Sequence, residues 1–304
     1  MNIRATISDF LERRSMRRYR SRVGWQIAPR YARYLERCRR EAAMTAPADA
    51  ETRAVIQAFR REGVTSFWTA DTAATATAVA ERIAARESAG EEVWQPLNDY
   101  AARNYAGDAW IDFPEFEDLF RGNLGGFLSG YFGTSFKILY GTMYRSEHVQ
   151  DDRTGSQMWH SDSGPGICVN VMFYVHDTTP AEGPLEALPW DTSLTLYEEE
   201  KRLLRAGALD KLGATKRDRI SAFYAKRIDE RFRSEIRQPH GRAGLVVPFL
   251  NNTLHRGGHP AAGLTRTAIV FHCYPSHRPT DFARYRRQGV TKTVPYPADP
   301  AAEF

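Results

Sequence analysis

Residues 157–175 read QMWHSDSGPGICVNVMFYV and hold the feature that decides the fold, a polar turn followed directly by an apolar run. Side chains alternate along this run, with one face made of Ile167, Val169, Val171, Phe173 and Val175 and the other of Cys168, Asn170, Met172 and Tyr174. This period of two predicts a β-strand over 167–175 with one face in a core. His160 and Asp162 come just before the strand.

Other segments extend this pattern or break it. Strands with the same alternation are predicted over 136–145, 244–250 and 266–274. The first third of the chain is mainly helical by pattern, with helices predicted over 51–61 and 72–86 and a strand between them at 64–68. We therefore expect a mainly β fold with flanking helices and a helical N-terminal region.

A second helical stretch interrupts the β-region. Residues 190–242 are charged and lack the period of two, and their apolar spacing predicts helices over 197–206 and 216–236. We expect these residues to form a helical insertion within the β-region. The segment after Thr280 is basic and then rich in proline, which indicates an irregular surface tail.

The composition is that of an ordinary globular protein. Of the 304 residues, 42% are apolar and 26% are charged, and a β-rich chain of this length commonly forms one domain, here 1–304. No stretch has the roughly 20 consecutive apolar residues of a membrane span, and the N-terminus lacks the apolar core of a secretory signal. The widely spaced Cys38, Cys168 and Cys273 match neither a zinc site nor a disulfide framework, which favours a reducing cytoplasm.

The positive charge is concentrated in a basic, helical N-terminal extension over 1–62. Residues 1–40 hold 12 Arg against Asp9, Glu12 and Glu36, a local charge of +9 within a formal total of +5. Such an arm can bind nucleic acid or anionic lipid, but aromatic and apolar residues are interleaved with its arginines. We expect amphipathic helices packed on the body of the protein, with the arginines in solvent and no nucleic-acid partner.

An imidazole and a carboxylate separated by one residue, His160 and Asp162, are the first candidate metal ligands. On extended backbone, residues i and i+2 point the same way, so both can reach one metal ion. A second histidine would complete a facial triad, which leaves three adjacent positions on Fe(II) for a bidentate oxoacid and dioxygen. His255 is the best-placed third ligand, and His259 and His272 are the alternatives.

Arg266 follows His255 by eleven residues and opens the apolar strand at 266–274. A guanidinium held in a fixed position can bind a carboxylate through two hydrogen bonds. If this strand lies beside the one that leads to His255, Arg266 can bind the distal carboxylate of 2-oxoglutarate while the other end of the oxoacid chelates iron. A structural ion pair is the alternative role.

Four further residues are candidates for lining the co-substrate pocket, because they lie on or beside the predicted strands: Tyr144, Arg145, Gln157 and Asn170. Their alternative role is that of polar residues on the solvent face of a half-buried sheet. The insertion at 190–242 would fall near the iron. There it can cap the substrate cavity or serve as a decorative or dimer-forming element, so a homo-oligomer stays an open alternative.

Together these motifs resemble the Fe(II)/2-oxoglutarate-dependent oxygenases, and most of all their phytanoyl-CoA dioxygenase-like branch. WHSD at 159–162, the strand and aspartate at 169–177 and EGPLEALP at 182–189 resemble that branch's metal pair, strand and Gly-Pro-Leu-Glu turn, and NTLHRGG at 252–258 with Arg266 resembles its second half. The resemblance implies a double-stranded β-helix, a cupin-like jelly roll. Where the branch commonly has Pro-Gly-Ser-His, this chain has PWDT at 189–192, so the branch's substrate classes are not carried over.

The resemblance implies Fe(II) as cofactor, 2-oxoglutarate and dioxygen as co-substrates, and hydroxylation of an unactivated carbon of a small organic molecule with release of succinate and CO2. Desaturation, epoxidation or ring closure are alternative outcomes. Halogenating relatives vacate the carboxylate position for chloride, so Asp162 argues against a halogenase. Two other classes stay open: a catalytically silent β-helix binding protein with a basic arm, and a cupin-like isomerase or hydrolase with another divalent metal.

Overall fold

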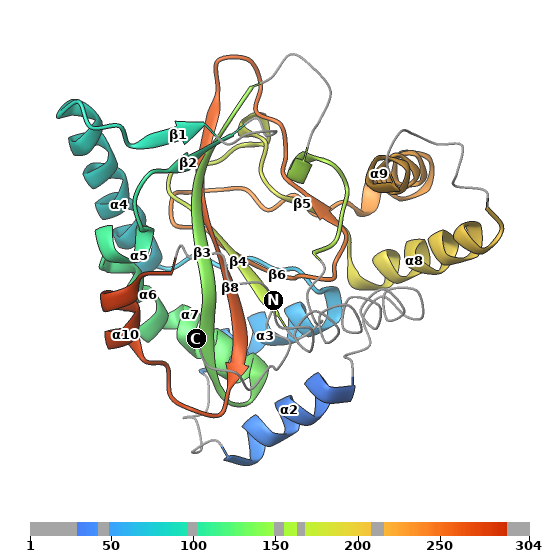
Figure 1. Cartoon of the computed structure of the whole chain (residues 1–304), viewed down its shortest axis with the longest axis horizontal. Helices are drawn as coiled ribbons and strands as arrows, with labels where there is room; N and C mark the ends of the chain where they lie inside the picture. The colour runs from blue at the N-terminus through green and yellow to red at the C-terminus, as the bar shows by residue number, and fades with distance from the viewer. Residues whose placement is uncertain are drawn as a thin grey trace, which may run out of the picture.

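A six-stranded antiparallel sheet forms the centre of the described part of the chain (Figure 1). The structure is a computed structural model and describes residues 29–41, 49–96, 102–148, 155–162, 168–207 and 216–290. In hydrogen-bonding order the strands are β1 (Trp94–Pro96), β2 (Ala102–Tyr105), β3 (Ser135–Glu147), β8 (Thr265–Ser276), β4 (Val169–Tyr174) and β6 (Val246–Leu250). A smaller sheet pairs β5 (Glu186–Ala187) with β7 (His255–Arg256).

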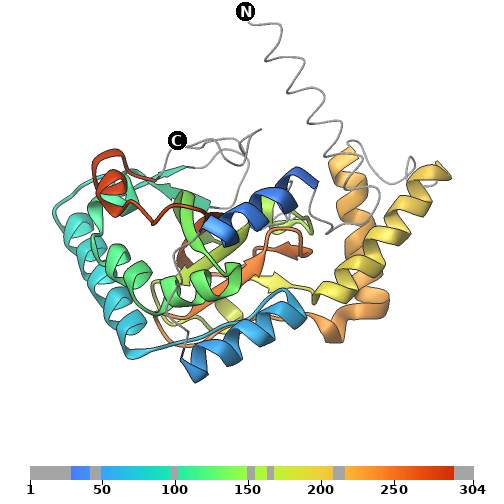
Figure 2. The same cartoon turned by 90° about the horizontal axis from the view of Figure 1, so that it is seen from below.

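Helices flank this core. They are α2 (Pro29–Glu41), α3 (Ala50–Glu62), α4 (Ala70–Ser88), α5 (Ala109–Asp112), α6 (Glu115–Arg121), α7 (Asn123–Phe132), α8 (Trp190–Arg205), α9 (Lys216–Arg227) and α10 (Phe282–Gln288). Short 3-10 turns lie at Gly155–Gln157, Pro180–Glu182 and Arg233–Glu235, and a π-turn at Ile228–Phe232 continues α9. In both views α4 lies at one end of the molecule and the pair α8 and α9 at the other (Figures 1 and 2). This sheet-rich core with flanking helices confirms the expected fold class.

The central strands are buried on both faces. Val171 on β4 and Phe271 on β8 face helices α3 to α7, within a large aromatic core. Met172 and Ala268 face the other way and pack with Ala187 of the small sheet, so an apolar interior lies between the two sheets. The predicted alternation is confirmed over 169–175. The prediction that only one face lies in a core is wrong, because the small sheet covers the second face.

Capping interactions set both ends of helix α3 and the start of helix α4. The Asp49 side chain accepts a hydrogen bond from the Thr52 amide at the start of α3, and Gly63 ends that helix with a φ of 71°. Thr69 and Thr72 form a capping box at the start of α4. The strand predicted at 64–68 is reduced to two isolated bridges to β6, because two helix ends leave only a short extended link.

Several sequence boundaries change in the structure. Helix α8 begins at Trp190 instead of residue 197, and α10 lies within the tail that was predicted to be irregular. In the arm, the described helix α2 packs on the body as expected: the Tyr34 hydroxyl donates to the Pro275 carbonyl, and Cys38 is fully buried. Residues 1–28 of the arm and 291–304 of the tail lie outside the described residues. In the described ranges, no helix has both the length and the apolar character needed to cross a membrane.

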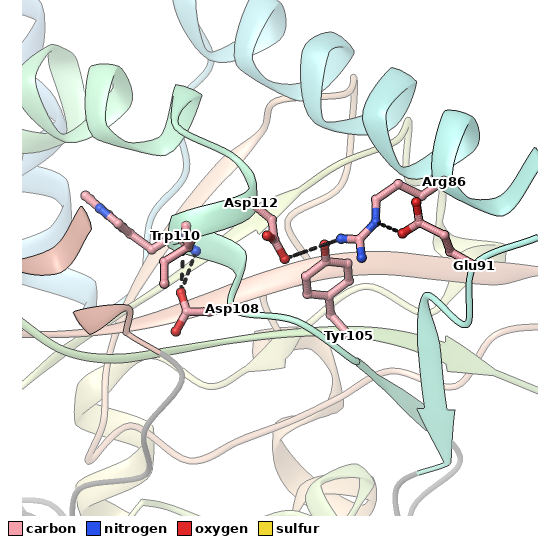
Figure 3. A network of polar contacts seen from close by, with 7 residues as sticks. Arg86, Glu91, Tyr105, Asp108, Trp110 and Asp112 are labelled. Carbon is pink, nitrogen blue, oxygen red and sulfur yellow. Dashed lines mark hydrogen bonds and ion pairs between the residues drawn. The ribbon is translucent and has the colours of Figure 1, made fainter. Parts of the chain in front are cut away.

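A polar network ties β2, the strand between β1 and β3, to the helical layer (Figure 3). Arg86 of α4 pairs with Glu91 at 2.6 Å and donates to the hydroxyl of Tyr105, which in turn donates to Asp112 at 2.8 Å. Burial and the hydrogen bond to Asp112 raise the pKa of Tyr105. The hydroxyl therefore stays protonated, and its two hydrogen bonds hold α4, β2 and α5 together.

Candidate metal centre

The two histidines of the predicted triad meet across an antiparallel backbone pair. The His160 amide donates to the His255 carbonyl at 3.0 Å, and the His255 amide donates to the His160 carbonyl at 2.9 Å. His255 also begins β7 and pairs with Ala187 of β5. The imidazole centroids are 4.4 Å apart. Two histidines that lie far apart in the sequence therefore direct one nitrogen each to the same point.

Asp162 completes the group from the same segment as His160. Its amide donates to the Asn251 carbonyl at 2.9 Å, which extends the backbone pairing past the histidines. Its carboxylate oxygens lie 3.7 Å from Nε2 of His160 and 3.8 Å from Nε2 of His255. One ligand atom from each of the three residues lies within 4.8 Å of the other two, and in the described part of the chain this is the one such cluster of three or more His, Cys, Asp or Glu residues. A facial arrangement of two histidines and one carboxylate suits Fe(II) with open positions.

Backbone carbonyls orient both imidazole rings. Nδ1 of His160 lies 2.6 Å from the Met158 carbonyl, and Nδ1 of His255 lies 2.7 Å from the Thr253 carbonyl. Since a carbonyl can only accept, each Nδ1 carries the hydrogen, and Nε2 keeps its lone pair for a metal ion. Each ring is therefore held in the tautomer that a metal requires.

Asn170 of β4 orients the carboxylate. Its side-chain amide is fully buried and donates to Oδ2 of Asp162 at 2.6 Å. Burial alone would raise the pKa of Asp162, but the charge of His255, His160 and His272 when protonated, together with this hydrogen bond, holds the pKa below its usual value. The ionised form, which is the form that binds a metal, is thus favoured.

The alternative third ligands lie outside the cluster. His272 faces the interior from β8 and stacks on Tyr140 with centroids 4.0 Å apart. Burial lowers the pKa of His272 to about 4, and its Nδ1 has no hydrogen-bond partner among the described residues. His259 lies in the loop after β7, against His148 at a ring distance of 5.1 Å. Neither joins the group of three ligand atoms.

Arg266 lies at the start of β8 with only 3% of its surface exposed. Its guanidinium donates to the Gly183 carbonyl and, at 3.1 Å, to the Ser146 hydroxyl, and it lies 5.8 Å from the ring of Tyr144. No carboxylate pairs with it in the described residues, and Nε has no acceptor there. A buried cation held by neutral groups carries an uncompensated charge, which an anionic ligand would balance.

The remaining pocket candidates divide between the two faces of the sheet. Tyr144 faces the interior beside Arg266, and Gln157 is buried with its Oε1 lacking a partner among the described residues. Arg145 lies on the opposite face of β3, where it pairs with Glu87 at 2.8 Å and lies 4.3 Å from the ring of Trp94. The structure thus brings the predicted site residues other than Arg145 and Gln157 toward the interior between the two sheets, and it buries Gln157 beside the segment that carries His160.

Four residues that shape this interior have no role in the sequence-based prediction of the pocket: Ser146, Gly183, Tyr140 and His272. Of these, only His272 was predicted to have any site role, as an alternative metal ligand. The sequence pattern could have placed His272 on the same side as Arg266, because residues 266, 268, 270 and 272 share one face of a strand. Ser146 and Gly183 reach Arg266 through cross-strand register and a loop contact. No spacing within the sequence signals either contact.

No protein-family model matches the chain, and no curated protein matches it. Solved structures do. The epimerase SnoN in complex with Fe3+, alpha ketoglutarate and nogalamycin RO aligns with 74% of this chain and 84% of its own, at 15% identity and a TM-score of 0.50. EctD from S. alaskensis, with 2-oxoglutarate and 5-hydroxyectoine, aligns over 83% and 87%, also at 15% identity and a TM-score of 0.50. The fold that the motifs implied is therefore confirmed: this chain is folded as non-haem 2-oxoglutarate-dependent enzymes are.

Proposed function

We propose that this protein is a non-haem Fe(II)/2-oxoglutarate-dependent oxygenase, with iron held by His160, Asp162 and His255. The residues fit the ion, because two imidazoles whose Nδ1 atoms are held by backbone carbonyls and one carboxylate converge on one point. Bound Fe(II), with 2-oxoglutarate and dioxygen, would supply the oxidising power to hydroxylate an unactivated carbon, with release of succinate and CO2. The substrate we propose is a small organic molecule.

Arg266 is the observation that carries this proposal. An isomerase or hydrolase that needs only a divalent metal has no use for a buried guanidinium that no carboxylate of the described residues neutralises, whereas an enzyme with a dicarboxylate co-substrate does. The donors of Arg266 that are not saturated by Gly183 and Ser146 would bind the distal carboxylate of 2-oxoglutarate. This contact would hold the oxoacid so that its other end can reach the metal ligands.

Further interior residues complete the proposed co-substrate site. Tyr144 forms the wall beside Arg266, and Gln157 offers a buried amide oxygen next to the segment that carries His160. Asn170 acts through Asp162, which it keeps in position. Arg145 is not included, because its guanidinium is engaged by Glu87 on the other face. The Asp162 carboxylate also supports hydroxylation over halogenation, since the third ligand position is filled.

An anaerobic titration tests the proposal. The full-length protein is loaded with Fe(II) and titrated with 2-oxoglutarate, and a weak visible charge-transfer band should develop only when both are present. After oxygen is admitted, succinate should form. His255→Ala should remove the band, and His259→Ala, whose ring lies outside the ligand cluster, should keep it. A wild-type protein that binds Fe(II) but gives neither band nor succinate would point to the isomerase or hydrolase alternative.

A further inference from the structure

The helical insertion is anchored beside a proposed iron ligand. It leaves the β-region after Ala187 of β5 and returns at Arg237, and these two residues exchange backbone hydrogen bonds of 2.9 and 2.8 Å. Ala187 is also the register partner of His255. Both ends of the insertion are therefore joined to the strand that pairs with β7.

Helix α8 holds the loop that precedes His255. The Ser193 hydroxyl accepts from the Leu254 amide at 3.0 Å, and the Tyr197 hydroxyl donates to the Asn252 carbonyl at 2.6 Å. Both side chains are buried, with exposed fractions of 0% and 7%. Residues 251–254 form a turn whose Asn251 and Leu254 backbone also bonds Cys168, Asp162 and Leu188, and α8 satisfies two further groups, the Leu254 amide and the Asn252 carbonyl.

The apolar core of the insertion contains the residue that precedes each proposed histidine ligand. Trp159 and Leu254, each less than 3% exposed, pack with Leu196 of α8 and with Phe223 and Ile228 of the α9 segment. This core is distinct from the two cores around the main sheet. A shift of α8 would therefore move the backbone that leads into His160 and the backbone that leads into His255.

We propose that the insertion is the positioning element of the metal centre, and that Ser193 and Tyr197 are positioning residues for His255. They hold the loop that carries Thr253, whose carbonyl sets the tautomer of the His255 ring. By linkage, a contact that stabilises the metal-binding conformation of the loop strengthens metal binding, and metal binding in turn stabilises the contacts of α8 with that loop. This inference rests on the proposed metal site. It assigns a role to the insertion, for which the sequence allowed either a cap over the substrate cavity or a decorative or dimer-forming element.

A matched pair of tyrosine variants tests it. Tyr197→Phe removes the hydroxyl that binds the Asn252 carbonyl, whereas Tyr224→Phe removes a hydroxyl of the same apolar core that donates to Glu200 within the insertion. Loss of groups that orient metal ligands typically weakens metal binding about 10-fold to 100-fold. We expect Co(II) affinity of the full-length protein to fall about 10-fold in Tyr197→Phe and Ser193→Ala, and to change less than about 2-fold in Tyr224→Phe.

Hydrogen exchange of the wild-type protein gives a second measurement that needs no variant to fold. Adding Co(II) should slow exchange of the Leu254 amide and of residues 193–197, but not of α4 at the other end of the molecule. Equal Co(II) affinities in the two tyrosine variants, with no protection in α8, would overturn the inference while leaving the metal site intact. A wild-type protein that binds no Co(II) would overturn the proposed function itself, and the inference with it.

Discussion

His160 and His255 exchange two main-chain hydrogen bonds of 3.0 and 2.9 Å, so the two imidazoles of the site belong to one antiparallel pair. Backbone bonds therefore set the spacing of the rings, and the Met158 and Thr253 carbonyls set their orientation. The geometry does not depend on bonds to a metal. A ligand variant should consequently change chemistry far more than it changes folding.

The first prediction follows for the triad. His160→Ala, Asp162→Ala and His255→Ala should each abolish succinate formation, because each removes one of three ligand atoms that lie within 4.8 Å of one another. Thermal unfolding in the presence of EDTA should change little relative to wild type, since a metal site contributes to stability mainly when it is loaded. Full activity in any one of the three variants would contradict the ligand assignment.

The second prediction concerns the residue behind the carboxylate. Asn170→Leu keeps the approximate bulk but removes the 2.6 Å hydrogen bond to Asp162. Because the carboxylate would lose its orientation, Fe(II) or Co(II) affinity should fall about 10-fold to 100-fold, with a smaller effect on the affinity for 2-oxoglutarate once the metal is bound. Isothermal titration with Co(II) measures the first effect, and unchanged Co(II) binding would show that Asn170 does not position Asp162.

The third prediction concerns two glycines behind Arg266. A Cβ on Gly258 would lie 2.2 Å from the Pro184 carbonyl oxygen and 2.5 Å from the carbonyl carbon of Gly183, which are backbone atoms that cannot turn away. Gly258→Ala should therefore displace the Gly183 carbonyl that binds Arg266. We expect a higher KM for 2-oxoglutarate, nearly unchanged Co(II) affinity and a loss of about 1 to 3 kcal/mol in stability.

Gly126→Ala is the control for that variant. A Cβ at Gly126 in helix α7 would meet nothing within 4 Å, and replacing a helical glycine by alanine typically adds about 0.5 to 1 kcal/mol of stability. It should leave the KM for 2-oxoglutarate as in wild type. If Gly258→Ala behaves in the same way, the loop contact with Gly183 has no part in holding the co-substrate.

Period-two alternation and ligand spacing were enough to predict the main strands and to select His160, Asp162 and His255, whose ligand atoms the structure brings together. Alternation also implies that Tyr144 and Arg145 cannot both line the pocket, because they are adjacent on one strand and only one of them can face the interior. The structure shows that it is Tyr144, while Arg145 contacts Glu87.

Other parts of the site are not visible in a local pattern. Strands β5 and β7 have two residues each, too few for a period to show, yet they carry Ala187 and His255. The register that places Ser146 opposite Arg266 depends on packing between strands more than a hundred residues apart, with a bulge between Ile138 and Tyr140. Neither short strands nor long-range register can be derived from the spacing of residues along the chain.

The fourth prediction is a pH dependence of stability caused by His272. Its pKa is lowered to about 4 by burial, from an unfolded value near 6.5, so the unfolded state binds the proton more readily. Stability is therefore complete above about pH 6.5 and is lost as the pH falls toward 4. Between pH 7 and pH 5 the contribution of His272 amounts to about 2 kcal/mol.

Urea unfolding of the metal-free protein at pH 7 and pH 5 measures this effect. His272→Phe keeps an aromatic ring against Tyr140 but cannot be protonated, so it should lose less stability than wild type over that interval. His240→Ala removes an exposed histidine and should retain the wild-type dependence. Identical pH dependence in wild type and His272→Phe would mean that His272 is not the buried titrating group.

The last prediction is that Arg266 anchors the distal carboxylate of 2-oxoglutarate. Its guanidinium is almost fully buried, receives no carboxylate from the described residues and is aimed by Gly183 and Ser146. Losing a charge-assisted contact while the partner charge stays buried typically costs about 2 to 4 kcal/mol, which corresponds to about 30-fold to 1000-fold in apparent affinity. Arg266→Ala should raise the KM for 2-oxoglutarate by that factor, with iron binding preserved.

The charge and the shape of Arg266 can be separated by experiment. Arg266→Lys should be intermediate, because an ammonium keeps the charge but loses the planar fork. Short 2-oxoacids that lack a distal carboxylate should lose less affinity than 2-oxoglutarate in Arg266→Ala, since they never made the contact. Arg145→Ala is the matched control, because its guanidinium lies on the other face of the sheet with Glu87. An unchanged KM for 2-oxoglutarate in Arg266→Ala, or an equal rise in Arg145→Ala, would remove Arg266 from the site.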